Sequence, residues 1–360
     1  MWLSRLRTVL AVGLTVSSVA AAVVASATPS GAAADPLVDK QWALAQIRAP
    51  QAWASSTGAG VVIAVVDTGV DLDHPDLAGK LVPGATFTDC PAGQRPCGDG
   101  DWRGPDGVGV ASDRHGTHVA GIAAAASANG TGIAGVAPDA RIMPVKVLDN
   151  AVGVYEDIAD GVRWASDHGA NVINLSLVGL PDDQVLAFLG LRTRLADAIA
   201  YAVARDVAVV AAAGNETLPL CSDPSFTRDV LCVVATDRYE VKALYSDLGV
   251  KPDLKVVAAP GGSGLPHCDE NVWSLVPRGT GSPRCGQADY DAFSGTSMAA
   301  PHVAGVAALL AAQGRTRAQI YDAILRTARL PFLGGVIRGV YTPVYGFGIV
   351  DAAAALAASP

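Results

Sequence analysis

One serine lies between a glycine and a run of small apolar residues in SGTSMAAPHVAG, residues 294–305. Ser297 falls in the first turn of a predicted helix, where its side-chain oxygen could simply accept a hydrogen bond from a free backbone N–H group. Alternatively, the same N–H groups and the helix dipole could stabilise an oxyanion formed when Ser297 attacks a carbonyl. The second interpretation requires a base.

Two histidines at the head of another predicted helix are candidates for that base. In DRHGTHVAGIAAAA, His115 precedes a glycine at the exposed entry of the helix, whereas apolar residues follow His118. We therefore expect His118 in the core. A metal site made by this pair is the alternative, but it lacks the i, i+4 spacing and the acidic partner of zinc-protease helices.

Two further polar residues follow buried strands. Asp67 ends the run VVIAVV, and Asn215 follows VAVVAAAG. A buried Asp67 carboxylate is costly unless a group such as a histidine pairs with it. Either residue alone could merely form a turn. The catalytic interpretation therefore depends on the joint occurrence of all these groups.

The elements that must position these residues alternate along the chain. Apolar runs predict buried strands at 61–66, 140–148, 171–177 and 207–213, and apolar spacing predicts helices at 118–126, 155–169, 191–205 and 302–312. Alternating strands and helices indicate an α/β fold of three layers, with a mainly parallel central sheet and helices on both faces. Sites of such folds lie beyond the carboxyl ends of the strands, where Asp67 and Asn215 are found.

Four motifs in this order, VVDTGVD, HGTHVAG, AAGN and SGTSMAAPHVAG, resemble the motif blocks of the subtilisin-like serine proteases, or subtilases. The resemblance runs from about Asp35 through GFGIVDAAAAL at 346–356. The order Asp, His, Ser is that of subtilisin. The resemblance implies a serine endopeptidase that acts on proteins and peptides through an acyl-enzyme.

The resemblance also implies a role for each residue. Ser297 would be the nucleophile, His115 its general base and later general acid, and Asp67 the group that orients the imidazole. Asn215 would donate its side-chain amide to the oxyanion. The rival interpretation is a secreted binding protein on the same scaffold, which the presence of all four groups argues against.

Two backbone segments would line the substrate cleft of such a protease. They are Leu175, Ser176, Leu177, Val178 and Gly179 on one side, and Ala212, Ala213 and Gly214 on the other. A peptide could add as a strand along the first segment, and the small residues of the second leave room for an apolar side chain. Val178 replaces the usual glycine and could narrow the cleft. Broad degradation and narrow processing both remain open.

Structural calcium is a further implication of the resemblance. Its ligands would be the side chains of Asp35, Asp76 and Asn129 with the carbonyl groups of Ser127, Thr131 and Ile133. Oxygen ligands of this kind suit Ca²⁺. The alternative is that Asp35 lies in a frayed terminus and Asp76 only begins a turn. No organic cofactor is expected.

The composition is typical of a soluble acidic protein. The 360 residues carry a net charge of −8, and 50% are hydrophobic, which is enough for a large core. The absence of a long Lys/Arg run argues against nucleic acid as a partner. We expect a monomer.

Residues 1–34 are typical of a secretion signal. Arg5 and Arg7 precede an apolar stretch from Val9 to Val24, which small residues separate from Asp35. A membrane anchor is the alternative, but serines interrupt the stretch, and it is shorter than the ~20 residues of a spanning helix. We expect a secreted protein with no stable membrane anchor, and a peptidase domain at 35–360 with no evident inhibitory pro-domain.

Six cysteines fall in three local couples. Cys90 with Cys97, Cys221 with Cys232, and Cys268 with Cys285 each enclose a loop that contains Pro or Gly. An exported chain meets oxidising conditions, where an even count suits disulfides. We favour these three nearest-neighbour disulfides over free thiols or a zinc site, because no C-x-x-C motif occurs.

Overall fold

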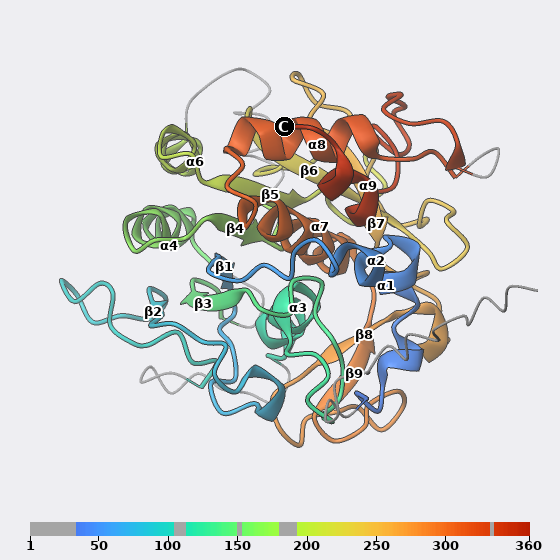
Figure 1. The fold of residues 1–360 in the computed structure, drawn as a ribbon. Coiled ribbons are helices and arrows are strands. Elements are labelled where there is room, and N and C mark those ends of the chain that lie inside the picture. Colours follow the sequence, from blue (N-terminus) through green and yellow to red (C-terminus); the bar gives the residue numbers. More distant parts are fainter. Residues whose placement is uncertain (1–33, 104–112, 150–152, 180–192, 332–334) are drawn as a thin grey trace, which may run out of the picture. The chain divides into compact units, whose positions relative to one another are not determined.

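A parallel sheet forms the centre of the structure. The computed structural model describes residues 34–103, 113–149, 153–179, 193–331 and 335–360. Within these ranges one seven-stranded sheet has the spatial order β2-β3-β1-β4-β5-β6-β7, and every neighbouring pair is parallel (Figure 1). Its strands are β1 (Val62–Asp67), β2 (Ala85–Thr86), β3 (Arg141–Lys146), β4 (Val172–Leu175), β5 (Ala208–Ala212), β6 (Val230–Thr236) and β7 (Val256–Pro260). Their nearly continuous apolar sequences are typical of a sheet covered on both faces.

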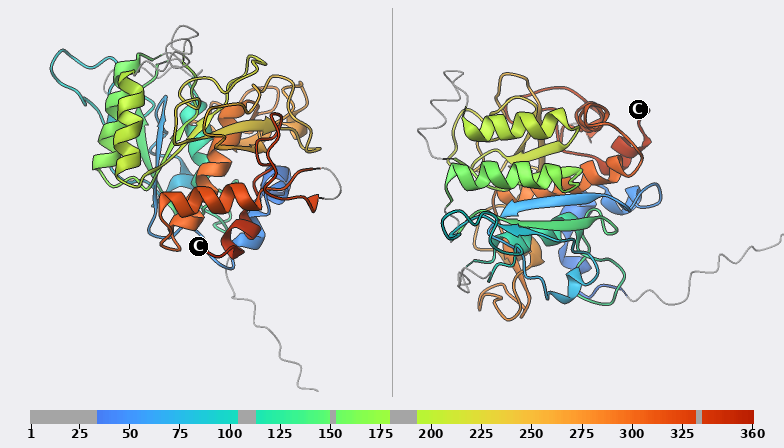
Figure 2. Two further views of the ribbon diagram at one scale, coloured as in Figure 1. Left: turned by 90° about the horizontal axis from the view of Figure 1, so that it is seen from above. Right: turned by 90° about the vertical axis from the view of Figure 1, so that its left-hand side faces the viewer.

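Helices supply that cover. On one face α3 (His115–Ala124) and α7 (Thr296–Ala311) contribute to one hydrophobic cluster. On the other face α4 (Tyr155–Asp167) and α6 (Arg194–Ala204) contribute to a second, and Figure 2 shows these two helices side by side over the sheet. The arrangement confirms the predicted three-layer α/β fold.

The remaining elements extend the side of the sheet on which α3 and α7 lie. The helices α1 (Trp42–Gln46), α2 (Ala49–Ala52), α8 (Arg317–Thr327) and α9 (Ala352–Ala357) add apolar side chains to the first cluster. A separate antiparallel pair consists of β8 (Val272–Leu275) and β9 (Tyr290–Phe293). Short 3-10 helices occupy Val38–Lys40, Pro75–Leu77 and Cys268–Glu270. None of the helices in the described ranges is long and apolar enough to cross a membrane.

The four strands predicted from the sequence correspond to β1, β3, β4 and β5, with ends that differ by one or two residues. The predicted helices correspond to α3, α4, α6 and α7, although α6 begins only at Arg194 and the first two residues of its predicted range lie outside the described residues. The predicted signal lies outside them too, apart from residue 34. The edge strands β2 and β7 and the interior strand β6 are not among the strands that the sequence pattern predicts.

Small residues let α7 lie deep in the fold. Ala299 and Ala300 are fully buried, and a Cβ atom at Gly305 would lie 2.5 Å from Cβ of Val136. A larger residue at 305 would therefore push the helix away from its neighbours. Such packing fixes the start of α7, where Ser297 lies, on a rigid support.

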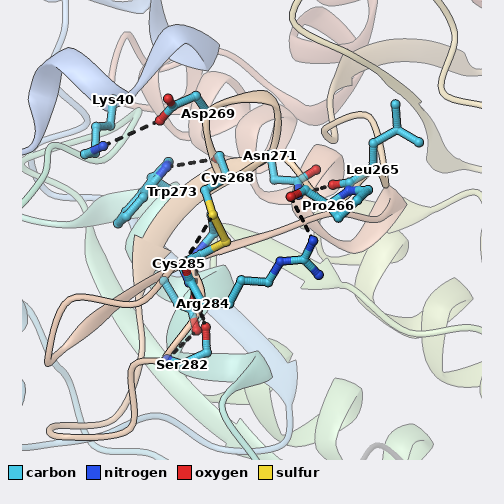
Figure 3. Close-up of a disulfide and its surroundings, with 12 residues drawn as sticks. Lys40, Leu265, Pro266, Cys268, Asp269, Asn271, Trp273, Ser282, Arg284 and Cys285 are labelled. Carbon is cyan, nitrogen blue, oxygen red and sulfur yellow. Dashed lines mark hydrogen bonds and ion pairs between the residues drawn. A yellow bond between two sulfur atoms is a disulfide. The ribbon is translucent and has the colours of Figure 1, made fainter.

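The three predicted disulfides are present. Cys90 pairs with Cys97, Cys221 with Cys232 and Cys268 with Cys285. Figure 3 shows the third pair, which joins a 3-10 helix to the segment that precedes β9. Hydrogen bonds surround it, including one from Nε1 of Trp273 to the carbonyl oxygen of Cys268 at 3.1 Å. The disulfide thus links the segment before β8 to the connection between β8 and β9.

Candidate active site

Asp67 and His115 form a direct hydrogen bond. Asp67 ends β1 and is fully buried. Its Oδ1 accepts from Nδ1 of His115 at 2.7 Å and from the backbone N–H of Thr68 at 2.8 Å. Because a carboxylate can only accept, the proton of a neutral His115 lies on Nδ1. Nε2 is then left with a lone pair and can take a proton from another group.

The entry of α3 sets the position of His115, its first residue. The N–H of Gly116 donates to Oγ1 of Thr68 at 3.0 Å, which ties the helix to the end of β1. A Cβ atom at Gly116 would lie 2.2 Å from the carbonyl oxygen of Gly69. Only glycine fits there, so His115 can approach Asp67 closely.

The charge of Asp67 controls the protonation of His115. Burial lowers the pKa of the imidazole, but the negative charge of Asp67 and its hydrogen bond raise it more, with a further contribution from Asp113. The net result is a pKa above the ordinary value of 6.5. The side chain of His115 remains 28% exposed, so it can meet a substrate.

Ser297 is the second residue of α7 and does not cap that helix. The N-cap is Gly295, which offers no side-chain hydrogen bond to the first turn. The Oγ atom of Ser297 instead donates to the carbonyl oxygen of Ser176 at 3.3 Å. The capping interpretation is therefore wrong, and the hydroxyl is directed to the end of β4.

A proline strengthens the link between Ser297 and Ser176. Pro301 lies inside α7 and has no N–H to donate to the carbonyl oxygen of Ser297 four residues earlier. That carbonyl oxygen accepts from Oγ of Ser176 at 2.8 Å. The helix thus gives up one internal hydrogen bond and gains a contact that holds Ser297 against the sheet.

Asn215 lies beside the start of α7. Its Oδ1 accepts from the backbone N–H of Thr296 at 2.9 Å and from Oγ1 of the same residue at 3.0 Å. These contacts fix which end of the side chain is the oxygen, so the Nδ2 end is the donor available to a ligand. A Cβ atom at Gly295 would lie 3.8 Å from this Nδ2, so the glycine leaves the donor uncovered.

His115 and Ser297 line one pocket of about 280 Å³. Four predicted substrate-segment residues, 176–179, line it as well, and Val178 is 39% exposed. The sequence did not predict four other lining residues, which are Leu148, Gly153, Tyr155 and Ile158. A mainly apolar wall beside two reactive side chains is typical of a substrate pocket.

The other predicted substrate residues do not line this pocket. Leu175, Ala212 and Ala213 are fully buried in or just after their strands. Gly214 is buried too, and its φ of +119° favours glycine. The side chains of Leu175, Ala212 and Ala213 therefore do not face a substrate, so a contact with residues 212–214 would have to be made by their backbone.

Comparison with known proteins identifies the family. Residues 58–349 match the subtilase family of peptidases. The chain belongs to the subtilase family. It is a serine endopeptidase, as the sequence motifs predict.

Several relatives support the assignment. This subtilase is 41% identical to thermitase of Thermoactinomyces vulgaris over 290 residues. The alignment covers 80% of this chain and 88% of thermitase. An extracellular protease of Xanthomonas campestris is 35% identical over 90% of this chain, but the chain spans only 57% of that relative. Among solved structures, a protease of Pseudoalteromonas arctica superposes with a TM-score of 0.72 and 34% identity, covering 91% of this chain and 99% of the other.

His118, the second histidine of this subtilase's HGTHVAG motif, lies in the core as expected. Its ring stacks on Phe293 with centroids 4.3 Å apart, and its Nε2 lies 3.3 Å from the carbonyl oxygen of Asp291. Burial, followed by the charge of His115, lowers its pKa to about 3. His118 is thus neutral and contacts other residues than His115 does.

Three of the predicted calcium ligands of the subtilase, Asp35, Asp76 and Asn129, are joined by hydrogen bonds around one loop. Asp35 accepts hydrogen bonds from the backbone N–H groups of Ala128 and Asn129 at 2.8 and 3.0 Å. Asp76 accepts from Nδ2 of Asn129 at 2.8 Å and from the N–H of Ile133 at 3.0 Å. Asp35 is therefore ordered rather than frayed.

Asp76 is a buried acid with a raised pKa. Burial, only partly offset by hydrogen bonds from Ile133 and Asn129 and reinforced by the charge of Asp35, raises its pKa to about 6. The described residues contain no group of three or more His, Cys, Asp or Glu side chains arranged for a metal ion. A cation here would therefore need amide and carbonyl oxygens beside the two carboxylates.

Proposed function

We propose that Ser297 is the nucleophile, His115 the general base and Asp67 the residue that orients His115. The observation that carries the proposal is the 2.7 Å hydrogen bond between Asp67 and His115, whose imidazole shares a pocket with Ser297. Serine is a weak nucleophile until a neighbouring base removes its proton. With Nδ1 held by Asp67, Nε2 of His115 is the nitrogen that performs this step.

The reaction then follows in two stages. Oγ of Ser297 attacks the carbonyl carbon of the scissile bond while Nε2 of His115 takes its proton, and the resulting imidazolium gives that proton to the leaving amine. Water next attacks the acyl carbon while His115 takes its proton; the bond to Oγ of Ser297 then breaks, the acid product leaves, and the imidazolium returns the proton to Oγ. The carboxylate of Asp67 stabilises the imidazolium formed in both stages and stays ionised.

Asn215 supplies the oxyanion donor in this proposal. The Nδ2 group of Asn215 and the backbone N–H of Ser297 would both donate to the negative oxygen of the tetrahedral intermediate. The hydrogen bonds from Thr296 to Oδ1 support the role of Asn215, because they occupy the oxygen end and leave Nδ2 as the end that can donate to a ligand. The direct test of the whole proposal is to compare the wild-type chain with Ser297→Ala on a diverse peptide library.

The substrate is proposed to bind as an extended strand along residues 175–179, with residues 212–214 on the other side. Main-chain hydrogen bonds would then supply affinity, and side-chain pockets would supply specificity. The apolar wall of Leu148, Tyr155 and Ile158 favours apolar substrate side chains. A library profile with a strong preference for charged residues at P1 would contradict the apolar preference expected there.

Val178 should restrict this cleft. Replacing it by glycine removes a half-exposed β-branched side chain from the pocket that holds Ser297. We expect kcat/KM for peptides with bulky residues next to position 178 to rise about 10-fold, the scale of small changes in pocket volume. Val178→Ala is the matched control, since it removes the branch without adding backbone freedom. A gain with glycine alone would point to flexibility instead.

Structural Ca²⁺ is proposed between Asp35, Asp76 and the loop 127–133. The oxygen ligands would be the side chains of those two acids and Asn129 with the carbonyl groups of Ser127, Thr131 and Ile133, a set that suits Ca²⁺. The bound charge would keep Asp76 ionised and hold the loop against the N-terminal segment. It supplies stability and takes no part in the chemistry.

Removing calcium should therefore lower the thermal stability. At a Ca²⁺ concentration of about 100 Kd, binding stabilises the native state by about 2.7 kcal/mol. For a domain of this size, whose unfolding entropy is about 0.7 kcal/mol/K, we expect EDTA to lower Tm by about 4 °C. Asp76→Asn should abolish the Ca²⁺-dependent shift, whereas the exposed control Asp322→Asn should retain it. Calorimetry with and without Ca²⁺ measures both, and an equal shift in both variants would disprove the site.

The organisation of the chain is proposed to be a secretion signal at 1–34 and a peptidase domain at 35–360. The three disulfides and the relatives named extracellular proteases support export. The proposed partners are protein and peptide substrates and not nucleic acid. The protein is proposed to act as a monomer, without an organic cofactor or a lasting membrane anchor. The bridged loops and Val178 favour some restriction of specificity over unrestricted degradation.

A further inference from the structure

We infer that Asp247 is a positioning residue for the oxyanion donor, because its carboxylate holds the loop that carries Asn215. This inference rests on the proposed role of Asn215. The loop 214–218 follows β5, and Asp247 comes from the segment between β6 and β7. The two segments are distant from the triad in sequence, and the motifs of the active site do not include Asp247.

The carboxylate of Asp247 is fully buried and satisfied from this loop. Its Oδ1 accepts from the backbone N–H groups of Glu216 at 3.1 Å and Leu218 at 2.8 Å. Its Oδ2 accepts from Oγ of Ser222 at 2.8 Å. All three partners can donate, so an ionised carboxylate fits the contacts.

Asp247 also holds the residue on the other side of Asn215. Its own N–H donates to the carbonyl oxygen of Gly214 at 3.0 Å. A Cβ atom at Gly214 would lie 2.0 Å from Oδ2 of Asp247, so the carboxylate packs directly on the backbone there. The residues before and after Asn215 are thus both anchored to one side chain and its backbone.

Asn215 consequently has two independent supports. Thr296, next to the nucleophile, fixes the oxygen end of its side chain, while Asp247 fixes the backbone from which the side chain projects. An oxyanion donor is effective only if it is already in place when the charge develops. Loosening the backbone should therefore slow the chemical step and leave the binding of substrate nearly unchanged.

The test is a double-mutant cycle between Asp247→Ala and Asn215→Ala. Asp247→Ala should lower kcat about 10-fold, less than the ~10²–10³ lost when a donor is removed outright. KM should change less than about twofold, because the donor acts on the transition state. In the Asn215→Ala background, Asp247→Ala should lower kcat by less than about twofold. Rates are normalised to active sites, and folding is checked by circular dichroism.

Two further variants separate positioning from folding. Asp247→Asn should restore most of kcat, since the amide oxygen can accept from both N–H groups and Nδ2 can donate to Ser222. Asp237→Ala is the matched control: Oδ1 of Asp237 also accepts from two backbone N–H groups, those of Tyr239 and Val241, but in another turn. Its kcat should stay at the wild-type value. If Asp247→Ala does not fold, Ser222→Ala removes one contact and should show a smaller loss with the same dependence on Asn215.

The outcomes distinguish this inference from the proposal on which it rests. An equal loss of kcat from Asp247→Ala with and without Asn215, or an equal loss from Asp237→Ala, would overturn the positioning role alone. A wild-type kcat in Asn215→Ala would overturn the role of Asn215 and the inference together. A loss confined to the background that contains Asn215 would support both.

Discussion

Replacing Ser297 by alanine is expected to lower kcat about 10⁶-fold, the magnitude found when subtilisin loses its nucleophile. The variant should fold normally, because among the described residues Oγ makes one hydrogen bond, of 3.3 Å, to the carbonyl oxygen of Ser176. Cleavage of a peptide library, normalised to protein concentration, gives the comparison. A small residual rate from the oxyanion donors and substrate binding is expected to remain.

Two controls make the result specific to the proposed mechanism. Ser294 is an exposed serine three residues before Ser297, and Ser294→Ala should leave kcat unchanged. His115→Ala should cost about as much as Ser297→Ala, and the double variant should cost no more than either, because nucleophile and base act as one unit. Equal cleavage by wild type and Ser297→Ala would refute the nucleophile, and additive losses would refute the pairing with His115.

The sequence was sufficient to predict the parts of the site that have a local signature. Asp67 and Asn215 could be placed at strand ends because each follows an apolar run, and parallel strands bring such ends to one edge. The same apolar signal was present in β6 and β7, which were not predicted. Their residues are buried throughout, as nearly all those of β1 are, so the same pattern is sufficient to predict both strands.

No local sequence pattern indicates which residues line the pocket or that Asp247 holds the loop that carries Asn215. Tyr155 and Ile158 lie at the start of an amphipathic helix, where apolar residues are ordinary core candidates. Only the packing of α4 against β1, β3 and α6 brings them into the pocket that Ser297 lines. Asp247 likewise looks like a turn residue in YSDLG, and its contacts to residues 214–222 depend on the tertiary fold. Long-range contacts of this kind cannot be obtained from the spacing of residues in one segment.

The pair Asp67 and His115 allows a second prediction, with a distinctive pH signature. Asp67→Asn should lower kcat about 10⁴-fold at neutral pH, because the amide no longer selects the tautomer with the proton on Nδ1 of His115. In the wild type, His115 is active only when neutral, so kcat/KM should fall as the pH drops through its pKa, which lies above 6.5. The acidic limb of the wild-type profile should therefore have its midpoint above pH 6.5.

Asp67→Asn should move the acidic limb of the profile to lower pH. Removing the charge of Asp67 leaves burial as the main influence on His115, and burial lowers the pKa of the imidazole. The residual activity of Asp67→Asn should thus persist to lower pH than that of the wild type, even though its plateau is far lower. Asp73→Asn, which changes an exposed acid paired with Arg103, is the control and should keep both the plateau and the limb. A limb that stays in place in Asp67→Asn would mean that another group, and not His115, titrates in the wild-type profile.

The direction of the shift therefore tests the electrostatic role of Asp67 separately from the size of the loss, which a purely steric disturbance could also produce.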